Sequence, residues 1–332
     1  MYFNAHLEVR IAGNLLKTVV SVKGQNDSQH IGSYCDLVVP LNCRIEYKGK
    51  PNQFLTDYPR NLFNAGDPIS VVAWYDGFPK LTLFTGFIYD FVEGTPITIK
   101  CMDSVYNLNL TTVDVSYTSI TLKNLFAVIL KDTDVKPDNN MIDLTLEDIT
   151  FRLMSPAAIC EWLKKEIGLN ISINGNKLYC NVASNTTGVV KYSTDQNVLD
   201  AKLQKQNAVF RKLKVKAWFI REDGTKDSFE VGDNNGALRE VFFYKIPRDQ
   251  ARYKQLAKEA LLKYQQHKYS GEIETLLYPE CELFWKAEYK SIRYPDQSGN
   301  YVIISNNFDI SEKGYRRKIK LSFLTDINGT AA

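Results

Sequence analysis

Residues 66–104 carry the pattern that most limits how this chain can fold. The stretch GDPISVVAWYDGFPKLTLFTGFIYDFVEGTPITIKCMDS holds three apolar runs, separated by turn residues at 76–77 and 93–96. The D-G dipeptide between two apolar runs is a strong hairpin signal, because glycine accepts the positive φ of a tight turn. Gly86 interrupts the second run, which predicts a bulge or a sharp bend there. The stretch is therefore predicted to form an antiparallel meander that closes into a small barrel.

The whole chain is predicted to be mainly β with an α+β part. Residues 1–112 read as strands, and the polar segment at 23–33 is predicted to be a long exposed loop between two of them. Residues 113–200 are predicted to form a middle α+β domain whose clearest helix spans 155–168. Ser155 is its predicted cap, Pro156 its first residue and Gly168 its end. Residues 201–332 return to β structure with one long helix at 249–269, and a duplication of barrels within the chain is one possibility.

The sequence offers no catalytic, cofactor or metal site. A net charge of +3 over 332 residues gives no concentrated basic field for nucleic acid or an anionic membrane. The six cysteines are scattered without a C-x-x-C pair and are predicted to be reduced core thiols. The three histidines fall in unrelated segments, and no nucleophile elbow or phosphate-binding glycine motif is present. Glu161 and Glu166 are predicted to share a solvated helix face with two lysines.

The chain is also expected to need neither export nor a membrane anchor. Its first residues, MYFNAHLEVRIAG, contain no apolar core of the kind that a signal peptide requires. No run approaches the roughly 20 apolar residues of a membrane helix.

Two predicted strands carry basic side chains at every second position. The two sets are Lys212, Lys214 and Lys216, and Arg316, Lys318 and Lys320. Period two places each set on one face of its strand. We interpret both as solvated sheet faces, and the alternative is a charged surface that meets a partner ring or lines a channel. Single-stranded nucleic acid would need aromatic residues on the same face, and we interpret the alternation as leaving that face without any.

Several segments, taken in order, resemble the baseplate hub proteins of phage tails. That family includes the late-control D protein of contractile phages and the N-terminal part of VgrG spike proteins in contractile injection systems. The segments are GSYCDLVVPLN, NAGDPISVVAWYDGFPKLTLFTGFIYDF, ITIKCMDSVYNL, MSPAAICEWLKKEIGLNI and GNYVIISNNFDISEKGYRRKIKLSF. The chain departs from the family where YPECELF replaces a frequent P-G-D opening of the second barrel, and where Asn307 replaces a frequent histidine.

The resemblance implies a structural protein and not an enzyme. It implies two tube-like β-barrels, at 1–112 and 201–332, around the middle domain. Three chains would form a homotrimer whose six barrels make a pseudo-sixfold ring between a hexameric tail tube and a separate trimeric spike. The tape measure protein and baseplate wedge are further expected partners, and DNA or an effector would pass only as cargo.

The resemblance also implies a location in the particle and a set of assembly surfaces. It implies no cofactor. The chain would be made in the cytoplasm of the host bacterium and reside in the tail baseplate of a virion or injection particle. Its polar loop, with Asn26, Asp27 and Ser28, would reach the adjacent ring and be disordered until assembly. The two basic rows are the other expected assembly surfaces.

Two other functions are weighed against the hub. A tail-tip module that binds carbohydrate or a receptor would display clustered Trp and Tyr on loops, whereas the four tryptophans fall within predicted strands or the helix. A tail-associated peptidoglycan hydrolase would need a converging carboxylate pair, and none is visible.

Overall fold

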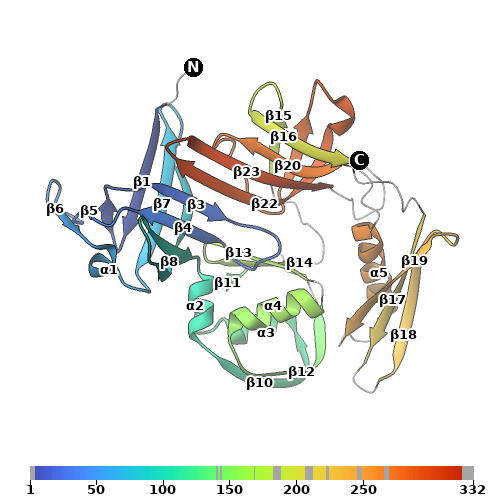
Figure 1. The fold of residues 1–332 in the computed structure, drawn as a ribbon. Helices are drawn as coiled ribbons and strands as arrows, with labels where there is room; N and C mark the ends of the chain where they lie inside the picture. The colour runs from blue at the N-terminus through green and yellow to red at the C-terminus, as the bar shows by residue number, and fades with distance from the viewer. Residues whose placement is uncertain are drawn as a thin grey trace.

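The computed structural model describes residues 4–139, 141–142, 144–167, 169–181, 188–205, 212–221, 224–244, 249–264 and 269–323. Strands dominate, which confirms the mainly β prediction. Figure 1 shows two strand-rich units side by side, a helix-containing unit below them and a small sheet with one helix at the far end.

The first unit contains the predicted meander. Its elements are β1 (Ala5–Ile11), β2 (Asn14–Leu16), β3 (Ser21–Gln25), β4 (Tyr34–Val39), β5 (Cys43–Glu46), β6 (Phe54–Asp57), α1 (Pro59–Leu62), β7 (Pro68–Tyr75), β8 (Leu81–Val92) and β9 (Ile97–Met102). β7, β8 and β9 pair antiparallel in sequence order, and Gly77 adopts a φ of 82° in the hairpin turn. Alternate residues of β7 and β9 are buried, so one face of the meander forms the core of this unit.

Gly86 has a different role from the predicted bulge. It pairs in register with Ile69, and the register shifts lie on either side of it, between Phe84 and Thr82 and between Ile88 and Asp90. A Cβ at Gly86 would lie 2.2 Å from the carbonyl oxygen of Met102. Glycine is required here because the backbones of β8 and β9 approach closely.

The middle unit follows the predicted α+β pattern. Its elements are α2 (Val105–Leu110), β10 (Val113–Thr121), α3 (Leu122–Ile129), β11 (Lys136–Pro137), β12 (Thr145–Met154), α4 (Pro156–Glu166), β13 (Asn170–Asn174) and β14 (Lys177–Asn181). The hydroxyl of Ser155 accepts a hydrogen bond from the amide of Ala158, which confirms the predicted cap of α4. The predicted end of this helix at Gly168 lies outside the described residues.

The last part of the chain divides differently from the sequence expectation. Its elements are β15 (Val189–Ser193), β16 (Val198–Lys205), β17 (Leu213–Ile220), β18 (Lys226–Gly232), β19 (Ala237–Tyr244), α5 (Gln250–Tyr264), β20 (Tyr269–Thr275), β21 (Lys286–Lys290), a 3-10 turn (Pro295–Gln297), β22 (Gly299–Ser311) and β23 (Gly314–Phe323). β15 and β16 pair with β21 and β20, so the second unit takes strands from before residue 200. β17, β18 and β19 form a separate sheet, covered on one face by α5. The predicted helix end at 265–269 falls partly outside the described residues.

Aromatic side chains pack the separate sheet against α5, within the same buried cluster as the middle unit. The ring of Tyr253 on α5 stacks on Phe219 of β17 at 3.7 Å, and Phe219 stacks on Phe243 of β19 at 5.2 Å. These contacts account for a sheet that stands apart from the second unit, because its buried face is already filled by its own helix.

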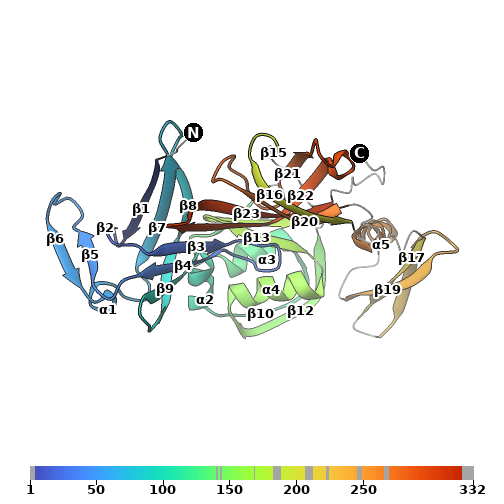
Figure 2. The ribbon, with the colours of Figure 1, turned by 45° about the horizontal axis from the view of Figure 1, so that its top comes forward.

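One long strand joins the two strand-rich units. The N-terminal half of β22 pairs with β21, and its C-terminal half pairs with β3 of the first unit. Among the strands that the structure describes, the pairings form an open path from β16 to β6 and not two closed rings. In the first unit the ring stays open because β22, a strand of the second unit, pairs with the edge of β3. Figure 2 shows this junction between the units, with the β5–β6 hairpin and the β17–β19 sheet at opposite ends of the molecule.

Candidate assembly surfaces

The segment predicted to be a free loop is part of the junction between the units. The amide of Asn26 donates to Oδ1 of Asn307 at 3.0 Å, and the amide of Asn306 donates to the carbonyl of Asn26 at 2.8 Å. The amide of Ser28 donates to the carbonyl of Ile304 at 2.8 Å. The tip of the segment therefore continues the pairing of β3 with β22.

The same segment also contacts the middle unit. Nζ of Lys164 on α4 donates to the carbonyl of His30 at 2.9 Å, and the amide of Ile173 on β13 donates to the carbonyl of Ile31 at 2.6 Å. Ile31 is buried and belongs to the hydrophobic core of the middle unit. The prediction of a long exposed loop is therefore wrong, because its polar residues are used in contacts within the chain.

Limited proteolysis checks this placement. We expect proteinase K to cut the β5–β6 turn at 48–53 well before the segment at 26–33. The turn is exposed, whereas the backbone of the segment is hydrogen-bonded to two other units. The cleavage sites would be mapped by mass spectrometry at early times. First cuts within 26–33 would restore the expectation of a free loop.

The side chain of Asp103 accepts a hydrogen bond from Ser33, at the C-terminal end of this segment. Its Oδ2 accepts from the amide of Ser33 at 2.5 Å and its Oδ1 accepts from the amide of Val105 at 3.0 Å. The side chain is 4% exposed, and burial raises its pKa to about 6, while the two amides act in the opposite direction. A Cβ at the neighbouring Gly32 would lie 2.5 Å from the carboxylate, so only glycine allows this approach.

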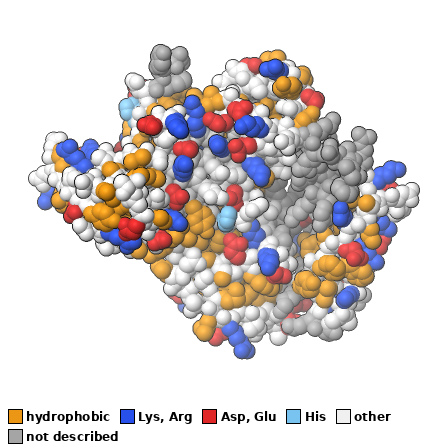
Figure 3. Space-filling model, in the orientation of Figure 1, with side chains coloured by type: hydrophobic (Ala, Val, Ile, Leu, Met, Phe, Trp, Pro, Cys, Tyr) orange, Lys and Arg blue, Asp and Glu red, His pale blue; other side chains and the backbone are white. Residues whose placement is uncertain are grey.

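The basic row of β23 lies among acidic side chains. Arg316 forms an ion pair with Glu274 at 3.4 Å, Lys318 lies opposite Glu274, and Lys320 lies opposite Glu272. Residues of alternating charge also face one another across six strands. In order from β23 to β8 they are Arg316, Asp309, Lys23, Asp36, Lys100 and Asp90. Figure 3 shows blue and red side chains interspersed over this part of the surface. The face is therefore polar with balanced charge.

The basic row of β17 is paired as well. Nζ of Lys214 lies 2.6 Å from Glu230, and Nζ of Lys216 lies 3.5 Å from the same carboxylate. Lys216 also lies 4.3 Å above the ring of Trp218, which shares its face. The interpretation that this face carries no aromatic residue is therefore wrong. Lys212 is exposed just before the strand begins.

The outer face of the β17–β19 sheet also carries apolar side chains that sequence reasoning missed. Leu238 is 53% exposed, Phe242 49% and Tyr244 42%. The strand register places these three opposite Lys214, Trp218 and Ile220. Figure 3 shows hydrophobic side chains at the surface of this lobe. We call this surface the outer sheet face. The alternation of Leu238, Glu240, Phe242 and Tyr244 was the available signal, but the sequence did not show which face α5 covers.

The other candidate groups do not assemble into a recognised site. His6 pairs with Asp76 and His30 with the nearby Asp27, both at the surface, and His267 lies outside the described residues. The described part of the chain holds no group of three side chains able to bind a metal ion. All six cysteines are buried and free, as predicted. Of the helices that the structure describes, none has the length and apolar character to cross a membrane.

The tryptophans do not form a displayed surface. All four are partly buried, and Trp162 packs its ring edge against Phe151 in the middle unit. Trp162 and Trp285 pack against buried clusters, whereas Trp74 stacks on His6 and Trp218 shares the face of Lys216, so only two of the four contribute to a core.

Comparison with known proteins gives matches in structure only. No protein-family model matches the chain, and no curated protein matches it significantly in sequence. A tail protein from Neisseria meningitidis MC58 is similar in structure, with a TM-score of 0.68 and 12% identity over 96% of each chain. The 43 kDa tail protein of prophage MuSo2 from Shewanella oneidensis has a TM-score of 0.64 and 14% identity, over 96% of this chain and 97% of that one.

A third similar structure comes from a secretion system. It is an E. coli component of the type VI secretion system, described as similar to the bacteriophage T4 tail proteins gp27 and gp5. Its TM-score is 0.62 with 9% identity, over 98% of this chain and 79% of that one. The three matches extend through both strand-rich units and the middle unit, so they concern the whole arrangement and not one domain. The chain therefore has the fold of phage tail proteins, as its sequence resemblance indicated.

Proposed function

We propose that this chain is a structural hub protein of a phage tail or contractile injection system. In this proposal three copies form a ring that joins the tail tube to a separate spike. The observation that carries it is the match to two phage tail proteins over 96% of this chain and nearly all of theirs. A likeness of this extent supports a common architectural role more than a shared reactive site.

The alternating charges across β23, β22, β3, β4, β9 and β8 support a surface that does not bind DNA. DNA binding draws on a field of unpaired lysines and arginines, whereas each basic side chain in this row faces an acidic one. Such a face suits contact with passing cargo without retaining it. We propose it as the wall that faces the delivery channel.

The outer sheet face supports association with further copies. Exposed Leu238, Phe242 and Tyr244 lie together on a lobe at one end of the molecule, where a neighbouring chain can reach them. Contiguous apolar surface on a soluble chain marks an interaction site. Lys214 and Lys216 share the carboxylate of Glu230, which offsets one of their two charges, and the contact we propose is mainly apolar.

Light scattering after size-exclusion chromatography tests the trimer. One chain has a mass of 38.0 kDa, so a trimer is expected at about 114 kDa. Exchange of both Phe242 and Tyr244 for serine should shift the protein to the monomer, because it removes the apolar contact. Tyr294→Ser is the matched control, since Tyr294 is 51% exposed and lies on the second unit, away from the sheet. A wild-type monomer at about 100 µM would contradict the proposed trimer.

The hydrolase alternative is separated by a zymogram on peptidoglycan. The proposal expects no clearing by the purified protein. A cleared zone would replace it with an enzymatic function.

A further inference from the structure

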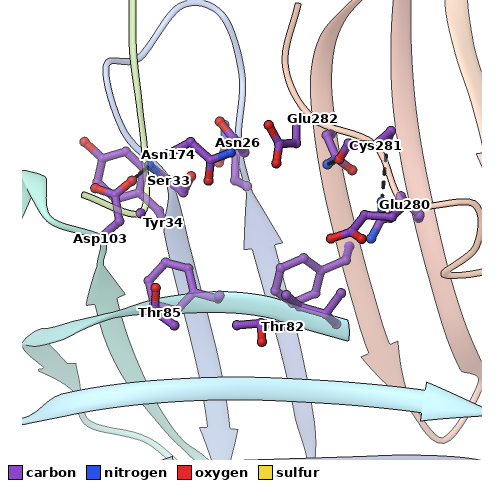
Figure 4. Close-up of a pocket in the computed structure, with 17 residues that line it drawn as sticks. Asn26, Ser33, Tyr34, Thr82, Thr85, Asp103, Asn174, Glu280, Cys281 and Glu282 are labelled. Carbon is purple, nitrogen blue, oxygen red and sulfur yellow. Dashed lines mark hydrogen bonds between the residues drawn. The ribbon is translucent and has the colours of Figure 1, made fainter. Parts of the chain in front are cut away.

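A cavity of about 260 Å³ lies where the first, middle and second units meet. Figure 4 shows Asp103, Ser33 and Tyr34 on one side of it, residues 280–282 on the other, and Thr82 and Thr85 of β8 along its floor. Asn174 of the β13 end also lines it. The cavity is thus bounded by all three units, and residues of both β3 and β22 line it.

Arg317 of β23 lines this cavity and is a buried charge without an ion pair among the described residues. Its side chain is 4% exposed, and its Nε is buried without a hydrogen-bond partner. Its Nη1 donates to Sγ of Cys281 at 3.4 Å, which is the bond drawn at Cys281 in Figure 4. No carboxylate among the residues that the structure describes forms an ion pair with it, in contrast to Arg316, which pairs with Glu274.

A buried guanidinium without a counter-ion is unfavourable. Arginine does not lose its proton in proteins, so burial cannot be relieved by neutralisation as it can for a carboxylate or a lysine. Burying a charge stabilises the fold only when the charge is paired and hydrogen-bonded. A thiol is a weak acceptor and leaves most of this requirement unmet. The guanidinium therefore has capacity for a further acceptor in the cavity.

Three carboxylates line the cavity, and none of them pairs with Arg317 among the described residues. Both oxygens of Asp103 accept backbone amides. Burial raises the pKa of Glu282 and the charge of Glu280 raises it further, while hydrogen bonds from Asn174 and Trp285 act in the opposite direction. Neither forms an ion pair with Arg317 in the described part of the chain. They line the cavity without compensating the guanidinium.

We propose that this cavity binds one oxyanion group, a carboxylate or a phosphate, on the guanidinium of Arg317. The planar fork of arginine matches both groups. Thr82 and Thr85 also line the cavity. An anion bound there would be held by residues of the first and second units together, so it would strengthen the junction.

Thermal unfolding in different anions tests the proposal. Sodium phosphate and sodium acetate are compared with sodium chloride at equal ionic strength and pH 7.5. At about tenfold excess over the dissociation constant, at least one of the two oxyanions is expected to raise the Tm by about 2 °C. The salt that raises the Tm shows whether the site takes a phosphate or a carboxylate. Equal Tm values in all three salts would overturn the proposal.

Two arginine variants separate a site from a general salt effect, because phosphate also stabilises proteins by exclusion from their surface. Arg317→Gln should lose the oxyanion-specific rise. Arg316→Gln is the matched control with the same charge change on the adjacent residue, and it should keep the rise because Arg316 lies on the other face of β23. A rise of the same size in Arg317→Gln would overturn the proposal.

A crystal structure of the wild-type protein in sodium selenate does not depend on the folding of any variant. The expected result is an anomalous selenium peak within hydrogen-bond distance of the Arg317 guanidinium. Peaks at surface lysines alone would identify an adventitious ion only, and would count against the site.

Discussion

Alanine in place of Gly24 is expected to lower the free energy of unfolding by about 2–4 kcal/mol. Gly24 lies on β3 between Cys35 of β4 and Phe308 of β22. A Cβ there would lie 2.0 Å from Cε1 of the Phe308 ring, a side chain that is only 9% exposed. Either the ring leaves the core of the first unit or β3 separates from β22. Chemical denaturation followed by fluorescence would measure the loss.

A double-variant cycle shows whether the ring is the cause. Phe308→Ala alone should cost about 3–5 kcal/mol through the cavity that it leaves. In the double variant the Cβ at position 24 meets no ring, so the combined loss should be smaller than the sum of the single losses by at least about 1 kcal/mol. Additive losses would show that Gly24 is needed for its backbone and not for the approach of Phe308.

Alanine in place of Asp103 is expected to destabilise the junction by about 2–4 kcal/mol when stability is measured near pH 4, where Asp103 is still protonated in the folded protein and its charge does not oppose folding. The substitution leaves the amides of Ser33 and Val105 without an acceptor in a buried place, and each such amide costs about 1–3 kcal/mol. Asp36→Ala is the matched control, because Asp36 is an exposed carboxylate on β4. Its loss should stay within about 0.5 kcal/mol. Similar losses in the two variants would contradict the role of Asp103.

The same carboxylate is expected to make stability depend on pH. Burial raises the pKa of Asp103 to about 6 in the folded protein, whereas the unfolded chain keeps a value near 3.8. Between these values the folded state holds a proton that the unfolded state has lost, so stability decreases as pH rises from about 4 to 6. The shift corresponds to about 3 kcal/mol, and this cost remains above pH 6.

Asp103→Asn isolates this contribution from the other carboxylates. The variant cannot titrate at this position, so wild type should lose stability relative to it as pH rises from 4 to 7. Denaturation at four or five pH values would give the difference. A constant difference would mean that the two amide hydrogen bonds hold the pKa of Asp103 near its ordinary value.

Local features of the fold could be predicted because they depend on neighbouring residues. The D-G turn, the cap at Ser155 and the alternation in β7 each act over a few positions, and the structure contains all three. The assignment of strands to units could not be predicted in the same way. β15 and β17 are similar in composition, yet one pairs with β21 and the other packs against α5. Only contacts between distant residues decide this.

The candidate assembly surfaces could likewise be predicted only in their local features. The spacing placed Lys214 with Lys216, and Lys318 with Lys320, on one face of their strands, but the acidic residues that face them lie on other strands. Lys212 lies before β17 begins. The polar segment at 26–33 has the composition of a free loop. Its backbone groups are nevertheless paired with residues near position 305 and with β13, which no local pattern indicates.

The bond between the amide of Asn26 and the side chain of Asn307 spans 281 residues of chain. During synthesis at about 5–20 residues per second, β3 therefore emerges from the ribosome many seconds before its partner strand β22 exists. Throughout that interval its free edge is available to any other extended chain. Truncated products that stop before Gly299 lack β22 entirely and would keep that edge open permanently. Production of this protein in a cell should thus be sensitive to incomplete translation, with aggregates formed by the shortened chains.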